Sequence, residues 1–237
     1  MEPVPESILV VTAHPDDVDF GVAGSVAVWT DAGAVVTYCV VTDGDAGGSD
    51  PTISREDMRM IRRAEQTAAA AEVGVKDLIW LGYPDGRVEA TLDLRRDIAR
   101  VIRMVRPQRV VAPSPERMWE RIYASHPDHL AVGEAATAAV YPDARNPFAF
   151  PELAAEGLEA HTAGELWLMA SPEPNVFVDI TSTIDRKLAA LRAHVSQSVD
   201  RDGQLETRIT EMLAGTGRRA GWEDGRLAEG FRRIATG

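Results

Sequence analysis

Two short turns hold most of the residues in this chain that could do chemistry. One is His-Pro-Asp-Asp at residues 14–17, and the other is His-Pro-Asp-His at residues 126–129. The chain has only five histidines, so chance is a poor explanation for finding His-Pro-Asp twice. Imidazoles mixed with carboxylates are side chains that bind zinc and related divalent ions. The two turns therefore indicate a metal site, provided that the fold brings them together.

The types of these residues favour three protein ligands and an open position. His14, Asp17 and His129 would supply two nitrogens and one oxygen, which is the pattern of a catalytic zinc site. A closed structural site usually needs four ligands with cysteine among them, and Cys39 is the one cysteine, in an apolar run typical of a core strand. We expect Zn²⁺ as the cofactor, with Fe²⁺ or another divalent metal as the alternative.

The other polar residues of the two turns can take catalytic or supporting roles. Asp16 is adjacent to a ligand and could collect the proton of an activated water molecule as a general base. His126 could polarise a substrate carbonyl or stabilise its oxyanion. Asp128 is expected to orient a ligand histidine through its other nitrogen, and Asp19 fits a helix N-cap and nothing more. Either turn alone could also be an Asx-type turn at the end of a strand.

The elements around the turns predict an α/β fold with a mostly parallel sheet covered on both faces. Short apolar runs rich in Val and Ile predict strands at residues 7–13, 34–42, 77–81, 109–112, 165–170 and 176–181. Helical patterns lie between them at residues 20–31, 54–73, 92–105 and 182–196. With a strand order of about 3-2-1-4-5, the first and fourth strands are neighbours, and both turns meet at the carboxyl edge of the sheet.

The sequence shows no linker that would divide the chain, so we expect one domain over residues 1–237. Residues 1–6 are predicted to be a flexible N-terminus, and residues 198–237 a helical C-terminal extension because apolar residues recur there at helical spacing. The loop at 115–125 and an irregular, proline-containing excursion at 141–162 are expected to shape the pocket.

Charge narrows the choice of partners. The 37 acidic and 25 basic residues give a net charge of −12, which opposes binding to a nucleic-acid backbone or an anionic membrane. The first residues are acidic and contain proline, unlike a secretory signal, and no apolar run reaches the length of about 18 residues that a membrane helix needs. We expect a cytoplasmic protein with a small-molecule substrate, and this charge is compatible with a homo-oligomer.

Six segments appear in an order that is typical of one family. They are Ala13-His-Pro-Asp-Asp17, Thr42-Asp-Gly-Asp-Ala-Gly47, Arg62-x-x-Glu65, Leu81-Gly-Tyr-Pro-Asp-Gly86, His126-Pro-Asp-His129 and Lys187-Leu-Ala-Ala-Leu-Arg-Ala-His-Val-Ser-Gln197. In these segments the chain resembles the LmbE/PIG-L family of zinc-dependent N-acetylglucosaminyl deacetylases and related amidases, in the form of a soluble bacterial-type member. The resemblance implies a Rossmann-like three-layer fold and hydrolysis of an N-acyl group from an amino sugar.

The resemblance also implies roles for individual residues. It gives the same ligands and catalytic residues as the spacing does: His14, Asp17 and His129 for the metal, Asp16 as base and His126 as oxyanion or acid partner. It adds Arg62 and Asp85 as contacts to the acyl group or sugar, although Arg59 and Arg63 are close competitors and Arg62 could instead pair with Glu65. Many members have glutamate where this chain has Val18, and some have a tyrosine near the position of Tyr123.

We therefore predict a metal-dependent hydrolase that removes an N-acetyl (N-acyl) group from an N-acetylglucosaminyl-type amino sugar or glycoside. An amidase acting on larger N-acyl amides, such as thiol conjugates, is the close alternative. A 2-His-1-carboxylate Fe(II) oxygenase is a distant one, because it uses the same ligand types but leaves Asp16 without a role. A metal-dependent sugar-binding protein without turnover is a third alternative, but it would leave both Asp16 and His126 without a role.

Overall fold

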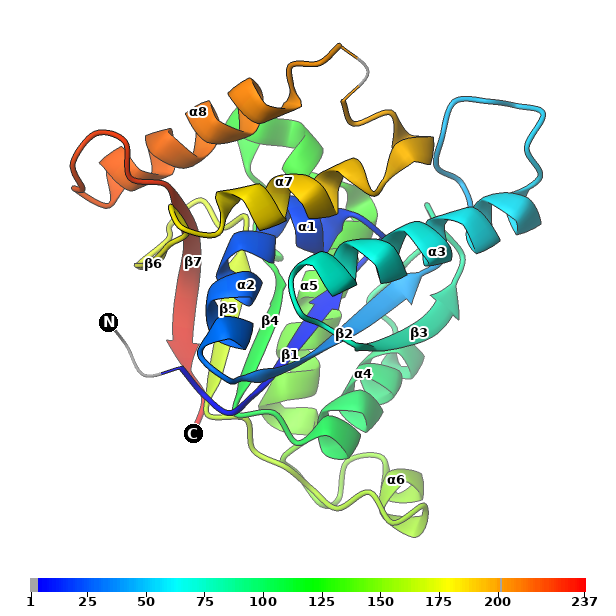
Figure 1. Ribbon diagram of the computed structural model, residues 1–237. Coiled ribbons are helices and arrows are strands. Elements are labelled where there is room, and N and C mark those ends of the chain that lie inside the picture. The colour runs from blue at the N-terminus through cyan, green and yellow to red at the C-terminus, as the bar shows by residue number, and fades with distance from the viewer. Residues whose placement is uncertain (1–3, 201) are drawn as a thin grey trace.

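The computed structural model describes residues 4–200 and 202–237, and these residues form one central sheet between two layers of helices (Figure 1). The strands in the described part are β1 (Ser7–Thr12), β2 (Val35–Thr42), β3 (Asp77–Tyr83), β4 (Arg109–Pro113), β5 (Glu165–Met169), β6 (Val176–Asp179) and β7 (Ala228–Ala235). Their order across the sheet is β3-β2-β1-β4-β5-β7-β6. Strands β1 to β5 run parallel, so the predicted order of the first five strands is confirmed.

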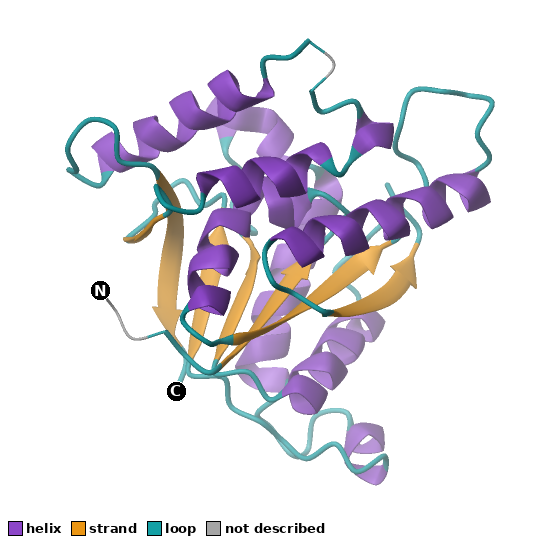
Figure 2. Ribbon diagram, viewed as in Figure 1, coloured by secondary structure: helices purple, strands orange, loops and turns teal. Residues whose placement is uncertain are grey.

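Helices cover both faces of this sheet (Figure 2). They are α1 (Asp17–Gly21), α2 (Ala23–Asp31), α3 (Arg55–Glu72), α4 (Leu92–Val105), α5 (Pro127–Ala138), α6 (Pro151–Ala155), α7 (Ile184–Arg192) and α8 (Leu205–Arg219). Along β1, Leu9 and Val11 point into the core shared with α4 and α5. The alternate residues Ile8 and Val10 point into the core shared with α1, α2, α3 and α7. The predicted sandwich with a mostly parallel sheet is thus confirmed.

Local sequence signals explain where α3 begins and ends. Ser54 is its N-cap, and its hydroxyl oxygen accepts a hydrogen bond from the backbone N–H of Asp57 at 3.1 Å. Gly74, just beyond the helix, has φ +83°, a conformation that favours glycine. The predicted helix at 20–31 is instead two helices, α1 and α2, with a break at Val22.

Helix α5 was not predicted, because its start coincides with the second His-Pro-Asp turn. Pro127 occupies the first turn of the helix, a position that suits proline. The His126 side chain is the N-cap and accepts a hydrogen bond from the N–H of Asp128 at 3.2 Å. The second turn is therefore the beginning of a helix, and the expectation of a loop there was wrong.

The C-terminal region combines a helix with a strand. Leu205, Ile209 and Leu213 of α8 pack in a third apolar cluster with Leu188 and Leu191 of α7. The prediction of a helical extension over 198–237 has to be corrected, because β7 pairs antiparallel with both β5 and β6. The strand was not predicted because charged residues interrupt the apolar pattern of β7.

The N-terminal segment and the helix lengths complete the description. Of the predicted flexible residues 1–6, residues 1–3 lie outside the described part. Val4 packs against the core, and the N–H of Glu6 donates a hydrogen bond to Gln108 Oε1 at 2.6 Å. Within the described residues, every helix is too short or too polar to cross a lipid bilayer.

Candidate metal and catalytic site

The fold brings the two turns together because β1 and β4 are adjacent strands. The first turn follows β1 directly, and the second lies beyond β4, at the start of α5. His14 Nδ1 lies 3.2 Å from His129 Nε2, although the two residues are far apart in the sequence. The expected meeting of both turns at the carboxyl edge of the sheet is thus what the structure shows.

Three side chains converge on one point between the turns. Asp17 Oδ1 lies 3.0 Å from His129 Nε2, and Asp17 Oδ2 lies 3.5 Å from His14 Nδ1. The ring nitrogens of His14, His126 and His129 also fall within 4.8 Å of one another. Two imidazole nitrogens and a carboxylate facing the same space are a donor set that a divalent metal ion of the zinc type fits.

The far side of the His14 ring is held by carboxylates. Its Nε2 lies 3.1 Å from Asp128 Oδ2 and 3.1 Å from Asp85 Oδ1. Asp128 is buried and also accepts hydrogen bonds from the N–H groups of Gly86 at 2.8 Å and Val88 at 3.2 Å. Asp128 therefore lies where the sequence analysis placed it, behind a candidate ligand histidine, so that His14 Nδ1 faces the other donors.

Electrostatic interactions stabilise the cluster. Burial lowers the pKa of His14, but the carboxylates of Asp17, Asp128 and Asp85 raise it to about 12. Burial also lowers the pKa of His129, and Asp17 raises it above its usual value. Burial raises the pKa of Asp17, whereas the two imidazoles hold it well below its usual range. A metal ion would compete with protons for the same imidazole nitrogens.

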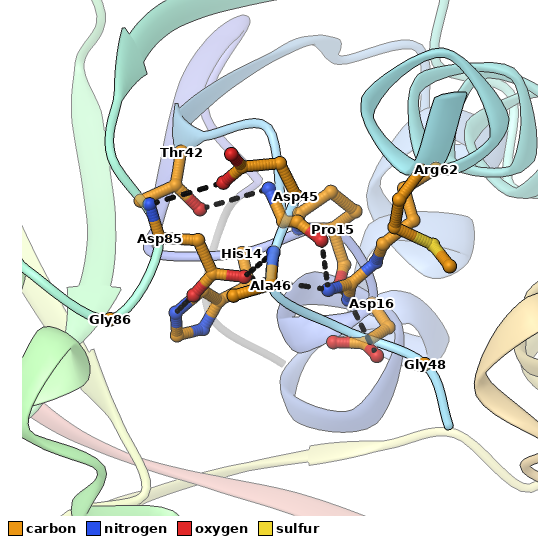
Figure 3. A network of polar contacts seen from close by, with 12 residues as sticks. His14, Pro15, Asp16, Thr42, Asp45, Ala46, Gly48, Arg62, Asp85 and Gly86 are labelled. Carbon is orange, nitrogen blue, oxygen red and sulfur yellow. Dashed lines mark hydrogen bonds and ion pairs between the residues drawn. The ribbon is translucent and has the colours of Figure 1, made fainter. Parts of the chain in front are cut away.

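Asp16 sits beside these donors in an unusual backbone conformation. Its φ is 87°, in the left-handed region that few residues other than glycine adopt. Its N–H donates to Gln66 Oε1 at 2.8 Å. Its Oδ2 accepts a hydrogen bond from Arg62 Nη2 at 3.1 Å (Figure 3). Burial and the charge of Asp17 raise the pKa of Asp16 to about 6, against the opposing effect of Arg62. A carboxylate with that pKa suits general-base chemistry near neutral pH.

Arg62 is the arginine of α3 that reaches the site, and it is buried. Its guanidinium donates to Pro15 O at 2.5 Å and to Gly44 O at 3.0 Å. A Cβ on Gly44 would lie 2.5 Å from Arg62 Nη1, so glycine at that position leaves room for the guanidinium. The competing arginines of α3 are directed elsewhere: Arg59 and Arg63 both pair with Asp43.

Asp85 also lies in the site, but its carboxylate is engaged with protein groups. Beyond its contact with His14, Asp85 Oδ2 accepts a hydrogen bond from the N–H of Ala46 at 3.0 Å. Figure 3 shows this arrangement, with Asp85, His14 and Ala46 on one side and the Arg62 contacts on the other. The pair Arg62–Glu65 is not seen, because Glu65 binds Ser196 instead.

A cavity of about 440 Å³ opens next to Asp17 and His129. Its wall is mostly apolar and includes residues from α1, β5 and α8, with two arginines: Phe20, Gly21, Met169, Ile209, Met212, Arg121 and Arg208. The loop at 115–125 lines it as expected, through Arg121, Tyr123 and Ala124. The expectation that the excursion at 141–162 shapes this pocket was wrong, since the residues of α8 take that place.

Three polar residues beneath the site were missed or misread from the sequence. Asp19 is not an N-cap, because it lies inside α1 and is fully buried. Its Oδ2 accepts hydrogen bonds from Gln66 Nε2 at 2.9 Å and from His194 Nε2 at 2.7 Å. The sequence analysis assigns no role to Gln66, and His194 belongs to the family segment at residues 187–197. A polar residue at a core position of a helix was the available signal for Gln66.

Comparison with known proteins identifies the family. The model of the PIG-L family, described as GlcNAc-PI de-N-acetylase, matches residues 9–140. The chain belongs to the PIG-L family. Among PIG-L relatives, a diacetylchitobiose deacetylase of Thermococcus kodakarensis is 34% identical over 81% of this chain and 70% of the relative. A Bacillus cereus protein named "Probable N-acetyl-alpha-D-glucosaminyl L-malate deacetylase 2" is 34% identical over 81% of this chain and 83% of the relative.

A solved structure that is similar to this chain agrees with the fold described above. It is an N,N'-diacetylchitobiose deacetylase from Pyrococcus horikoshii in complex with an inhibitor, with a TM-score of 0.88 and 30% identity, covering 98% of this chain and 84% of that one. The family description and the names of these relatives are those of deacetylases. This PIG-L chain is therefore a hydrolase of the N-deacetylase type, and the predicted family and enzyme class are confirmed.

Proposed function

We propose that this PIG-L enzyme removes an N-acetyl group from a small N-acetylglucosaminyl-type glycoside, with a divalent metal, zinc in the first place, held by His14, Asp17 and His129. One observation carries the proposal: in a PIG-L chain, these three donors converge, and two of them, Asp17 and His129, line an open cavity. A metal held there would polarise the amide carbonyl and lower the pKa of a water molecule.

Asp16 is proposed as the general base. Its carboxylate is adjacent in sequence to a proposed ligand, and Arg62 holds one of its oxygens in place. With a pKa of about 6, it is ionised at neutral pH and can accept the proton of the attacking water. It can then pass this proton to the amine that leaves.

His126 is proposed to stabilise the developing oxyanion, and its hydrogen bonding supports that role. Nδ1 accepts a hydrogen bond from the N–H of Asp128, so in the neutral ring the proton is on Nε2. Burial and the charge of His14 lower the pKa of His126, which favours the neutral ring. Nε2–H is then a fixed hydrogen-bond donor for the carbonyl oxygen.

The cavity would hold the rest of the substrate. Arg62 and Asp85 are proposed to contact the sugar or acyl group from the polar side of the site. The mostly apolar wall of the cavity favours a substituent beyond the acetyl group itself. A volume of about 440 Å³ exceeds what an acetyl methyl group needs, and this keeps an amidase with a larger acyl group as the second candidate.

The test is release of free amine from a panel of N-acyl compounds. Metal-free enzyme would be reloaded separately with Zn²⁺, Fe²⁺ and other divalent ions and assayed with N-acetylglucosaminyl glycosides and their longer N-acyl analogues. We expect acetate and amine in equal amounts, with the highest kcat/KM for the N-acetyl compounds. A preference for long acyl chains would support the amidase instead. Oxygen consumption without amine release would overturn both in favour of an oxygenase.

A further inference from the structure

A row of buried polar side chains runs beneath Asp16. Gln66 on α3, Asp19 on α1 and His194 after α7 each have an exposed fraction of 0%. Asp16 N–H donates to Gln66 Oε1 at 2.8 Å, Gln66 Nε2 donates to Asp19 Oδ2 at 2.9 Å, and His194 Nε2 lies 2.7 Å from the same oxygen. The row thus connects α3, α1 and the end of α7 to the backbone of a single residue, the proposed base.

The hydrogen-bond donors and acceptors in this row determine how the Gln66 amide is oriented. Gln66 Nε2 donates to Asp19 Oδ2, so the NH₂ group of Gln66 faces inward. The amide oxygen of Gln66 then points at Asp16 and accepts the hydrogen bond from its backbone N–H. His194 Nε2 contacts the same Asp19 oxygen at 2.7 Å. The orientation of the Gln66 amide is therefore set by Asp19.

Asp16 needs such support because of its own backbone. A left-handed φ of 87° is strained for an aspartate, and strained residues persist where the surroundings determine their conformation. The φ angle of Asp16 decides where its carboxylate points. A hydrogen bond to its N–H acts directly on that angle.

The row is itself anchored in the core. Lys187 donates to the backbone oxygen of Asp19 at 2.7 Å and forms a fully buried ion pair with Glu229 on β7 at 2.7 Å. Glu229 in turn accepts hydrogen bonds from the N–H groups of Gly24 at 3.1 Å and Ser25 at 2.7 Å. Both the end of α1 and the start of α2 are thereby tied to the sheet, so Asp19 has little freedom to move.

We propose that Gln66, Asp19 and His194 form a positioning relay that holds the backbone of Asp16 in its left-handed conformation and so aims its carboxylate at the reaction centre. None of the three touches the cavity wall, so they are positioning residues. The proposal rests on the proposed function in one respect, because it takes Asp16 as the base.

Gln66→Met tests the relay, since methionine keeps the side-chain length and removes both hydrogen bonds. We expect kcat per bound metal to fall by about 10- to 100-fold, the usual scale for an orienting partner. KM and metal content should stay within about twofold, because the ligands and the cavity are not altered. The crystal structure of the variant should show Asp16 outside the left-handed region.

Asp19→Asn is a milder second variant in case Gln66→Met folds poorly. An Asn side chain can present its NH₂ group to Gln66. The Gln66 amide can then turn over, and it would lose the hydrogen bond that it accepts from the Asp16 N–H. We expect a smaller loss in kcat than in Gln66→Met. Tyr38→Phe is the matched control. Tyr38 is buried near Asp19, and its hydroxyl makes no hydrogen bond with the described residues, so kcat should not change.

The outcomes separate the relay from a purely structural role and from the proposed function. A lower melting temperature with unchanged kcat per bound metal, or an Asp16 conformation that does not change in Gln66→Met, would overturn the relay. If the wild-type enzyme hydrolyses no N-acyl substrate, the proposed function fails. Even then, the conformation of Asp16 in the crystal structure of Gln66→Met decides whether the relay positions the Asp16 backbone.

Discussion

The two His-Pro-Asp turns share their first three residues and differ in the backbone around them. In the first turn, Asp16 has a left-handed φ, and its carboxylate accepts a hydrogen bond from Arg62. In the second, Pro127 begins helix α5, and Asp128 falls in the first helical turn, buried behind His14. The same aspartate position is thus the proposed base in one turn and lies behind a proposed ligand in the other.

The first histidines of the two turns also differ in their proposed roles. His14, the first residue of its turn, is a proposed ligand, with carboxylates on its far nitrogen. His126, at the same position of the second turn, caps a helix with one nitrogen and leaves the other free to donate. In that turn His129 is the proposed ligand. Backbone geometry, rather than the tripeptide, decides which residue has which role.

Replacing a ligand should give the largest effect. In His129→Ala, the site loses one of its two proposed imidazole ligands, so metal and activity should be lost together, with a loss well beyond the roughly 100-fold effect of an orienting partner. Metal content by elemental analysis and kcat would be measured on the same preparation. His161→Ala is the control, because His161 binds the carbonyl of Pro107, away from the site. Full metal content in His129→Ala would show that another residue is the ligand.

Asp16→Asn should have the next largest effect. Asparagine keeps the shape of the side chain but cannot accept the proton of water, so we expect kcat to fall by about 10²- to 10⁴-fold. Metal content should match that of the wild type, since Asp16 is not a proposed ligand. A steady-state assay combined with metal analysis checks this result. Activity close to wild type would remove Asp16 from the role of base.

Asp128→Asn changes the equivalent position of the second turn and should act through the metal. Asparagine cannot accept all the hydrogen bonds that Asp128 makes, so His14 would be less well oriented and metal affinity should fall by about 10- to 100-fold. At saturating metal, kcat should be near that of the wild type. Titration of metal-free protein with zinc measures the affinity. If Asp128→Asn and Asp16→Asn changed metal affinity and kcat in the same way, the two aspartates would not have the different roles that we propose for them.

Much of this arrangement could be predicted from the sequence because the fold has strong local signals. Alternating β-branched runs and helical patterns gave the parallel strands, and the strand order then put both turns at one edge. The C-terminal strand could not be predicted, because its charged residues pair across the sheet and hide the alternation; Arg233, for instance, pairs with Glu165 on β5. The relay beneath Asp16 depends on tertiary contacts between three helical regions, which no local pattern encodes.

Tyr123→Phe should have the smallest effect, and it tests whether the second turn needs help from the segment before it. Tyr123 lines the cavity, but 70% of it is exposed, and its hydroxyl accepts a hydrogen bond from Arg121 Nε at 2.9 Å. An exposed hydrogen bond of this kind contributes about 1 kcal/mol or less, so kcat and KM should change by no more than about fivefold. His126 would then be sufficient as the oxyanion donor. A loss of about 10²-fold in kcat, measured against a matched His126→Ala variant, would transfer that role to the tyrosine hydroxyl.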